Sequence, residues 1–399
     1  MKKTKTIALG AVLLLTGANL MKAQETQVKF FGQPEFQSER VTKKGNYFPN
    51  PPSPYPAWKD STYTDSTKSA FTTGNFVLFV TSQLTERISV LSENTANIEN
   101  GTPTFHVQRL MLRYFIKDYF SVRVGKMFNP IGYWNNQYNL GLVLQPTIQR
   151  SILIRTPEEG GVTQVNNVGV QFEGDNITKL RIFYRAFICN GNNTNNVESN
   201  LKNQFAFTGQ LGVEPAEGLK LLVSAHYDHF SAGPGANLNV VRPKGGTTLS
   251  SQSAIAYMNP GKKLEFISEY SYHSTQMDSI GETASQGLST YLGYKVTNKL
   301  IPYAQYVHVL AGSKNETDKF FVGTTDGIQA KLQNLCVGVR YKFTANFVVK
   351  FEYHYNVNST IYQDKTFPLQ NPLLPGYIAG DKVAKTITQG PRVQFAFAF

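Results

Sequence analysis

The chain has 399 residues, of which 41% are hydrophobic and 13% aromatic, with a formal net charge of +12 and only two cysteines. So few cysteines exclude a small secreted domain that depends on a dense set of disulfides, and we expect Cys189 and Cys336 to be free and structural. No apolar run approaches the roughly 20 residues that a membrane-spanning helix requires, which excludes a helical membrane protein.

Residues 1–23 have the pattern of a secretory signal peptide. Three lysines precede the apolar stretch Ile7–Leu15, and Ala23 is the small residue expected beside a cleavage site. This segment contains 4 lysines and no acidic residue, so the expected mature chain, residues 24–399, keeps a net charge of +8. A basic excess of this size is compatible with an anionic partner.

From Gly74 onward the chain consists of segments of about ten residues in which apolar and polar residues alternate. This period of two is typical of strands with one apolar and one wet face. Tight connections at Lys117–Asp118 and Thr344–Asn346 predict antiparallel hairpins. An opening strand near Gln27–Phe36, interrupted by Pro34, and a closing strand near Thr386–Phe399 bring the predicted total to about 16 strands.

Short and long connections alternate between these strands. We expect the short ones to be periplasmic turns and the long ones to be external loops, as in outer-membrane barrels. After the proline-rich segment Pro49–Pro56, the predicted long connections are Asn94–Pro103, Phe128–Val165, Asn190–Lys202, Phe230–Ser250, His273–Ser285, Ala311–Gln329 and Asn358–Lys385. The expected fold class is therefore all-β, a transmembrane antiparallel barrel wide enough for an aqueous channel.

The charged residues share the parity opposite to the apolar residues. On the segment Lys179–Cys189, Leu180 and Ile182 belong to the apolar face, whereas Arg181 and Arg185 belong to the other. An arginine facing lipid at the bilayer midplane would cost about 2–4 kcal/mol, so the charged face must line the lumen. The arginines predicted to line the pore and select anions are Arg109, Arg113, Arg123, Arg181, Arg185, Arg150 and Arg155.

Bracing is the alternative role for these arginines, because lumenal carboxylates can pair with them. Glu173, Glu158 and Glu159 are the acidic residues that could neutralise the group. Rings of one charge sign, in contrast, select ions of the opposite sign. Both interpretations follow from the sequence.

The longest predicted connection inside the barrel segment, residues 128–165, contains Trp134 and Gly160–Gly161. Loops of this length in a compact protein are usually functional. We predict that this one folds into the barrel and narrows it; an external loop with a short helix or hairpin is the alternative.

The final residues alternate aromatic and other side chains and place Phe395, Phe397 and Phe399 on one face. This ending resembles the signal that bacterial porins present to the barrel-assembly machinery. The stretch Arg109–Gly174, with Val124–Gly132 and Asn167–Gln171, resembles the phosphate-selective porin O and P family. That resemblance implies a homotrimer in outer-membrane lipid that guides anions past arginines.

The sequence gives little support for a metal site, a cofactor site, nucleic-acid binding or an enzymatic activity. His226 and Asp228 share a predicted lumenal face but have no evident third metal ligand, and no cofactor motif is present. Basic residues interleaved with aromatics can bind nucleic acid, but here the aromatics alternate with the charges and are expected at the lipid and its interfaces. We therefore predict a non-enzymatic porin without cofactor or nucleic-acid partner; an outer-membrane enzyme using His273–Ser274, and an adhesin or secretion-complex subunit, are the alternatives.

Overall fold

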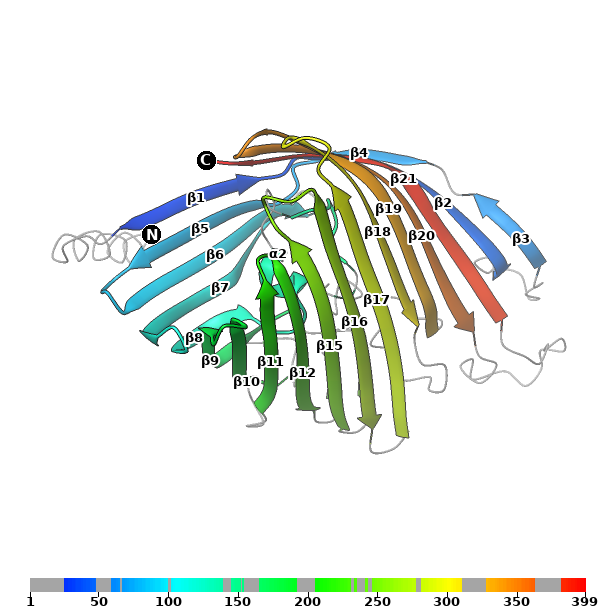
Figure 1. The fold of residues 1–399 in the computed structure, drawn as a ribbon. Helices are drawn as coiled ribbons and strands as arrows, with labels where there is room; N and C mark the ends of the chain where they lie inside the picture. The colour runs from blue at the N-terminus through cyan, green and yellow to red at the C-terminus, as the bar shows by residue number, and fades with distance from the viewer. Residues whose placement is uncertain are drawn as a thin grey trace, which may run out of the picture.

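The computed structural model shows one antiparallel barrel built from strands that follow each other around the ring in chain order (Figure 1). It describes residues 25–47, 59–64, 67–99, 102–138, 145–151, 153, 165–191, 205–230, 233–234, 241–242, 246–277, 281–310, 328–362 and 382–399. The predicted signal peptide and the segment Pro49–Pro56 lie outside these residues.

Sixteen strand positions close the ring, which confirms the predicted fold class and strand number. The first nine are β1 (Thr26–Gly32), β5 (Phe76–Gln83), β6 (Ile88–Glu99), β7 (Thr102–Lys117), β8 (Phe120–Phe128), β9 (Asn166–Ile177), β10 (Ile182–Asn190), β11 (Phe205–Ala216) and β12 (Leu219–Phe230). The other seven are β15 (Gly246–Met258), β16 (Leu264–Met277), β17 (Gly281–Tyr294), β18 (Leu300–Leu310), β19 (Ile328–Thr344), β20 (Phe347–Tyr362) and β21 (Lys382–Ala398).

The seam joins the first and last strands. β21 pairs with β1 at Phe31↔Ala398 and, beyond a break at Gln33–Pro34, with β2 (Glu35–Tyr47). Pro34 cannot donate to the ladder, which explains why the opening strand is divided there. On its other side β1 pairs with β5, whereas β2 pairs with β4 (Lys68–Thr72) and β3 (Lys59–Thr64), two strands that the sequence pattern did not reveal.

The two faces of the barrel wall differ as the alternation predicts. On β11, Phe207 and Leu211 are 51% and 54% exposed, whereas the intervening Thr208 and Gln210 are buried. On β10, Ile188 is exposed and Phe187 is buried. An outer surface made of such apolar side chains is stable only in a low-dielectric environment, as in a membrane barrel.

Two predicted long connections are wrong. Residues 94–99 belong to β6 and pair with β7 up to Glu99↔Thr102, and residues 273–277 continue β16 opposite β17 up to Met277↔Gly281. Apolar alternation is required only where a strand crosses hydrocarbon, whereas backbone pairing can continue beyond that region without it. The periodicity therefore predicted the apolar part of each strand but not its polar extension.

The remaining elements are few in the described part of the chain. β13 (Gly233–Pro234) and β14 (Val241–Arg242) form a small separate pair within one long connection, and α2 (Trp134–Tyr138) lies within another. No helix among the described residues is long and apolar enough to cross a membrane. Cys189 and Cys336 are both buried and free, as expected.

Candidate functional site: an inward segment and an arginine cluster

The connection between β8 and β9 packs against the inner side of the wall. Gly132 donates its backbone N–H to Ser224 Oγ on β12 at 3.0 Å. Tyr133 and Trp134 donate theirs to Glu269 Oε1 on β16 at 2.5 and 3.0 Å. Glu269 is fully buried on the face opposite to the exposed Tyr270, so its carboxylate anchors the start of α2.

Aromatic packing reinforces this anchor. The Trp134 and Tyr291 rings meet edge to face, with centroids 6.1 Å apart. They belong to a buried cluster that also contains the small residues Ala254 and Ala256 and is completed by side chains from β10, β12, β16, β18 and β19. The expectation that aromatics lie at the lipid and its interfaces is wrong for this group, because an aromatic segment inside the barrel needs aromatic and small partners on the inward parity.

A second anchor holds residues 145–151. The Ile148 N–H donates to Glu352 Oε1 on β20 at 2.6 Å, and Lys350 Nζ donates to the Thr147 carbonyl at 3.1 Å. Lys350 and Glu352 are both fully buried. The described parts of the predicted 128–165 loop are therefore attached to the inner wall at β12, β16 and β20.

Gly132 offers a test of how tightly the segment fits. Its φ is +68°, and an added Cβ would collide with the side chains of Gln252 and Glu269. We expect Gly132→Ala to destabilise the inward segment by about 1–3 kcal/mol, because the positive φ is unfavourable for alanine and its Cβ would overlap the neighbouring side chains. Protease cleavage of folded protein in detergent should become faster for this variant. Gly209→Ala is the matched control, since a Cβ at Gly209 meets nothing within 4 Å, and equal cleavage of the two variants would contradict the prediction.

Three of the predicted arginines converge on one buried carboxylate. Arg123 and Arg113 lie 2.8 and 3.2 Å from Glu173 Oε1, and Arg185 lies 4.0 Å from Oε2. The Arg113, Arg123 and Arg185 side chains remain 35%, 25% and 19% exposed, whereas Glu173 is fully buried. Ser121 and Gln171 also donate to Glu173, so the carboxylate lies behind a layer of cations.

The other predicted arginines occupy different surroundings. Arg109 pairs with Glu93, and Arg181, in the turn before β10, lies 3.3 Å from Glu214. Arg185 also contacts Asp175 at 3.3 Å. Arg150 is half-buried beside the second anchor, and Arg155, Glu158 and Glu159 lie outside the described residues.

A cavity of about 290 Å³ lies between the inward segment and the arginine-bearing wall. Asn136 and Gln137 line it from the side of α2. Arg181, Arg185 and Lys220 line it from the wall, with Asp175 and Glu214 beside them. Polar side chains of α2 thus face cations across this cavity, which is the arrangement that a passing solute would meet.

Sequence reasoning located the charged inward parity but not the roles of all its members. Glu269 and Glu352 lie on the charged, inward parity of β16 and β20, and in the structure they accept backbone N–H groups from the inward segment. Arg340 on β19 is itself buried and lies 2.7 Å from the buried Glu265, so it braces the wall. A carboxylate on the inward face of a strand could be recognised in the sequence. The backbone N–H groups that it binds could not be predicted, because they belong to a distant segment of the chain.

No protein-family model and no curated protein matches the sequence. The fold, in contrast, is similar to solved structures. An anion-selective porin from Comamonas acidovorans superimposes with a TM-score of 0.56 at 12% identity, over 94% of this chain and 100% of that one. The chain has the porin fold. OmpT of Vibrio cholerae, in a trimer form, gives 0.55 at 13% over 94% and 100%, and the DcaP channel of Acinetobacter baumannii gives 0.54 at 10% over 94% and 97%. Membership of the phosphate-selective porin O and P family stays a prediction.

Proposed function

We propose that the mature chain is an outer-membrane porin, exported with its signal peptide removed, that lets small solutes diffuse through a water-filled channel and prefers anions. The observation that carries the proposal is the cluster at Glu173. Its three arginines reach the lumen while the carboxylate that they share is buried behind them. A solute in the channel therefore meets the cations at closer range than the anion.

The size of this preference follows from the local charge balance. In the described structure four carboxylates, Glu93, Glu173, Asp175 and Glu214, are contacted by Arg109, Arg113, Arg123, Arg181 and Arg185, and Lys220 adds a further positive charge beside the cavity. The excess is small, so the preference arises from the exposed position of the cations. Guanidinium groups suit oxyanions such as phosphate, because they stay charged and offer several donors.

The inward segment is proposed to narrow the channel next to this cluster. Its anchors on β12, β16 and β20 attach it to widely separated parts of the ring, and α2 lines the cavity opposite Arg185 and Lys220. Placing the narrow point beside the cations would increase their influence on each ion that passes.

Planar-bilayer recording tests the proposed function directly. The purified protein should give steady single-channel steps and, under a potassium chloride gradient, a reversal potential displaced toward the chloride equilibrium potential. Inorganic phosphate added at low salt should reduce the chloride current by competing for the guanidiniums. Absence of conductance would reject the pore, and displacement toward the potassium potential would reject the anion preference. The proposed homotrimer should appear as a threefold mass before heating in detergent.

The assembly role proposed for the C-terminal aromatics can be tested at the seam. The Phe399 backbone exchanges hydrogen bonds of 2.9 and 3.0 Å with Phe30, and their rings stack with centroids 5.3 Å apart. Phe397 stacks on Phe399, and Phe395, on the same outward face, is 43% exposed. Deleting Phe399 removes the ring and the closing hydrogen bonds, so we expect less folded protein in the outer membrane.

The pore of the molecules that do fold should be unchanged, because Phe399 lies far from the arginine cluster in strand order. Quantitative blotting of heat-modifiable barrel in membrane fractions measures the effect. Phe343→Ala is a suitable control, since Phe343 is an exposed aromatic beside the neighbouring turn at Ala345–Asn346. Equal yields for the two variants would refute the assembly role.

A further inference from the structure

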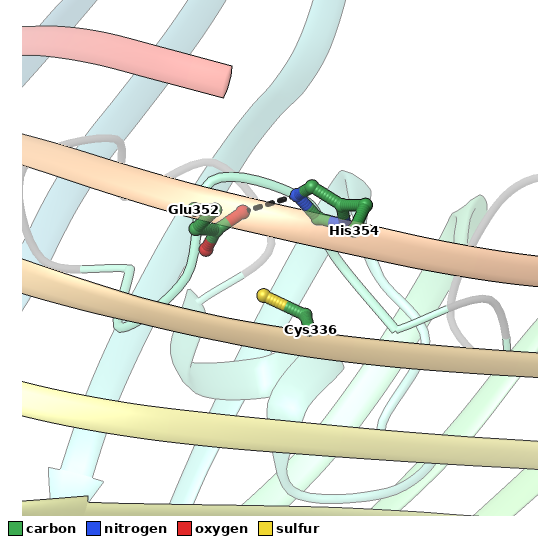
Figure 2. Close-up of side chains that lie close together, drawn as sticks. All are labelled: Cys336, Glu352 and His354. Atoms are coloured by element: carbon green, nitrogen blue, oxygen red, sulfur yellow. Dashed lines mark hydrogen bonds and ion pairs between the residues drawn. The ribbon is translucent and has the colours of Figure 1, made fainter. Parts of the chain in front are cut away.

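Cys336, Glu352 and His354 form a compact cluster on two neighbouring strands. Cys336 lies on β19 directly opposite His354 on β20, and Glu352 is two residues before His354 on the same face. One ligand atom from each side chain, a sulfur, a carboxylate oxygen and a ring nitrogen, lies within 4.8 Å of the others. Figure 2 shows the sulfur of Cys336 directed toward Glu352, which is joined to His354 by a hydrogen bond.

The cluster is buried and rigid. The three residues are at most 3% exposed, and the paired strands fix their backbones. Glu352 Oε1 accepts hydrogen bonds from Tyr303 Oη at 2.7 Å and from the Ile148 N–H at 2.6 Å. These donors fix one carboxylate oxygen and leave Oε2 directed toward His354, 2.6 Å away. Such hydrogen bonds to a ligand's second oxygen are typical of metal sites.

The donor set suits a divalent transition metal. Thiolate, imidazole and carboxylate are the ligands that zinc uses, with bonds of about 2.0–2.3 Å that place tetrahedral ligand atoms about 3.3–3.8 Å apart. Side-chain shifts of roughly 1 Å would produce this spacing. Glu352 Oε2 and His354 Nε2 would move apart from 2.6 Å, and Cys336 Sγ would move toward both. Magnesium and calcium, which prefer oxygen ligands, do not fit a thiol and an imidazole.

Within the described structure, the His354 ring is held by one hydrogen bond, the one to Glu352. His354 Nδ1 has no hydrogen-bond partner among the described residues, although buried polar atoms are normally paired. The ring is therefore oriented through Nε2 alone, which is the nitrogen that faces Glu352. A metal bonded to Nε2 would hold the ring in the orientation that it already has.

We propose that Cys336, Glu352 and His354 form a zinc-type metal site in the barrel wall, with the fourth position taken by water. On binding, the Cys336 thiol releases its proton to solvent and the His354 proton moves from Nε2 to Nδ1, so that thiolate, imidazole and carboxylate each donate one electron pair. The two ligand charges balance the dication. Because Glu352 also anchors Ile148, the bound metal stabilises the inward segment.

Cobalt(II) is the probe, since zinc has no visible absorption. Unmodified full-length protein refolded with cobalt and freed of excess should hold one ion per chain and show a thiolate charge-transfer band in the near ultraviolet. It should also show the visible bands of tetrahedral cobalt, and zinc should displace them. Cys336→Ser should remove the charge-transfer band, and Tyr303→Phe, which keeps all three ligands, should weaken binding about tenfold.

Cys189→Ser is the matched control, because Cys189 is the other buried cysteine and contacts the Ala206 carbonyl away from the cluster. It should retain the full cobalt spectrum. The proposal is overturned if the unmodified protein binds no cobalt after refolding or binds it without a thiolate band. It is also overturned if Cys189→Ser abolishes the band. The spectrum of the unmodified protein decides the matter even where the Cys336 variant does not fold.

Discussion

Glu269→Leu is expected to raise the single-channel conductance by about twofold or more, because a barrel of this size is wide unless a segment fills it. Glu269 accepts two backbone N–H bonds, from Tyr133 and Trp134, in a fully buried position. Leucine leaves both donors unpaired, at about 1–3 kcal/mol each. That loss should release the start of α2 from β16 and open the channel, accompanied by current noise as the segment moves.

Glu269→Gln is the matched variant, since its amide oxygen can still accept both N–H groups in a side chain of the same shape. Its conductance should stay near that of the unmodified protein. Planar-bilayer recording measures both variants, and heat modifiability in detergent checks that each barrel is closed. A folded Glu269→Leu barrel with unchanged conductance would show that the inward segment does not limit ion flow.

The second large effect is expected on ion selectivity. Neutralising Arg113 and Arg185 together as glutamines should reduce the ratio of anion to cation permeability by about twofold or more, because fixed charges in a narrow cleft set the local ion concentrations. The change would leave Glu173 with Arg123 alone, and the cluster would no longer present an excess of cations. The reversal potential should move toward zero, more clearly at low salt where screening is weak.

Glu173→Gln provides the opposite change at the same place. It removes the buried negative charge and leaves three arginines, so the anion preference should increase. Arg87→Gln serves as the control for loss of an arginine, because Arg87 is exposed in the short turn between β5 and β6, outside the cluster. If the double arginine variant and Glu173→Gln both leave the reversal potential unmoved, the arginines only brace the wall.

The sequence by itself determined the all-β barrel, its strand number and, where apolar and polar residues alternate clearly, the two faces of a strand. On β10 the alternation around Arg185 assigned Phe187 to the inside and Ile188 to the outside, and the structure has both there. This information is local, because a period of two reports the environment on either side of a strand. It fails where a strand continues without that alternation, as at residues 94–99, and where pairing is irregular, as for β3 and β4.

The partners across the lumen were decided only by the tertiary structure. Glu173 and Arg113 lie 60 positions apart in the numbering, and Glu269 and Tyr133 lie 136 apart, yet each pair is in contact. The alternation shows that these side chains point into the lumen. It does not show at what height in the barrel they lie or which other segment they contact. Register and the path of the inward segment fix those distances. The same holds for Cys336 and His354, whose common site exists because β19 and β20 pair in the register that places them opposite each other.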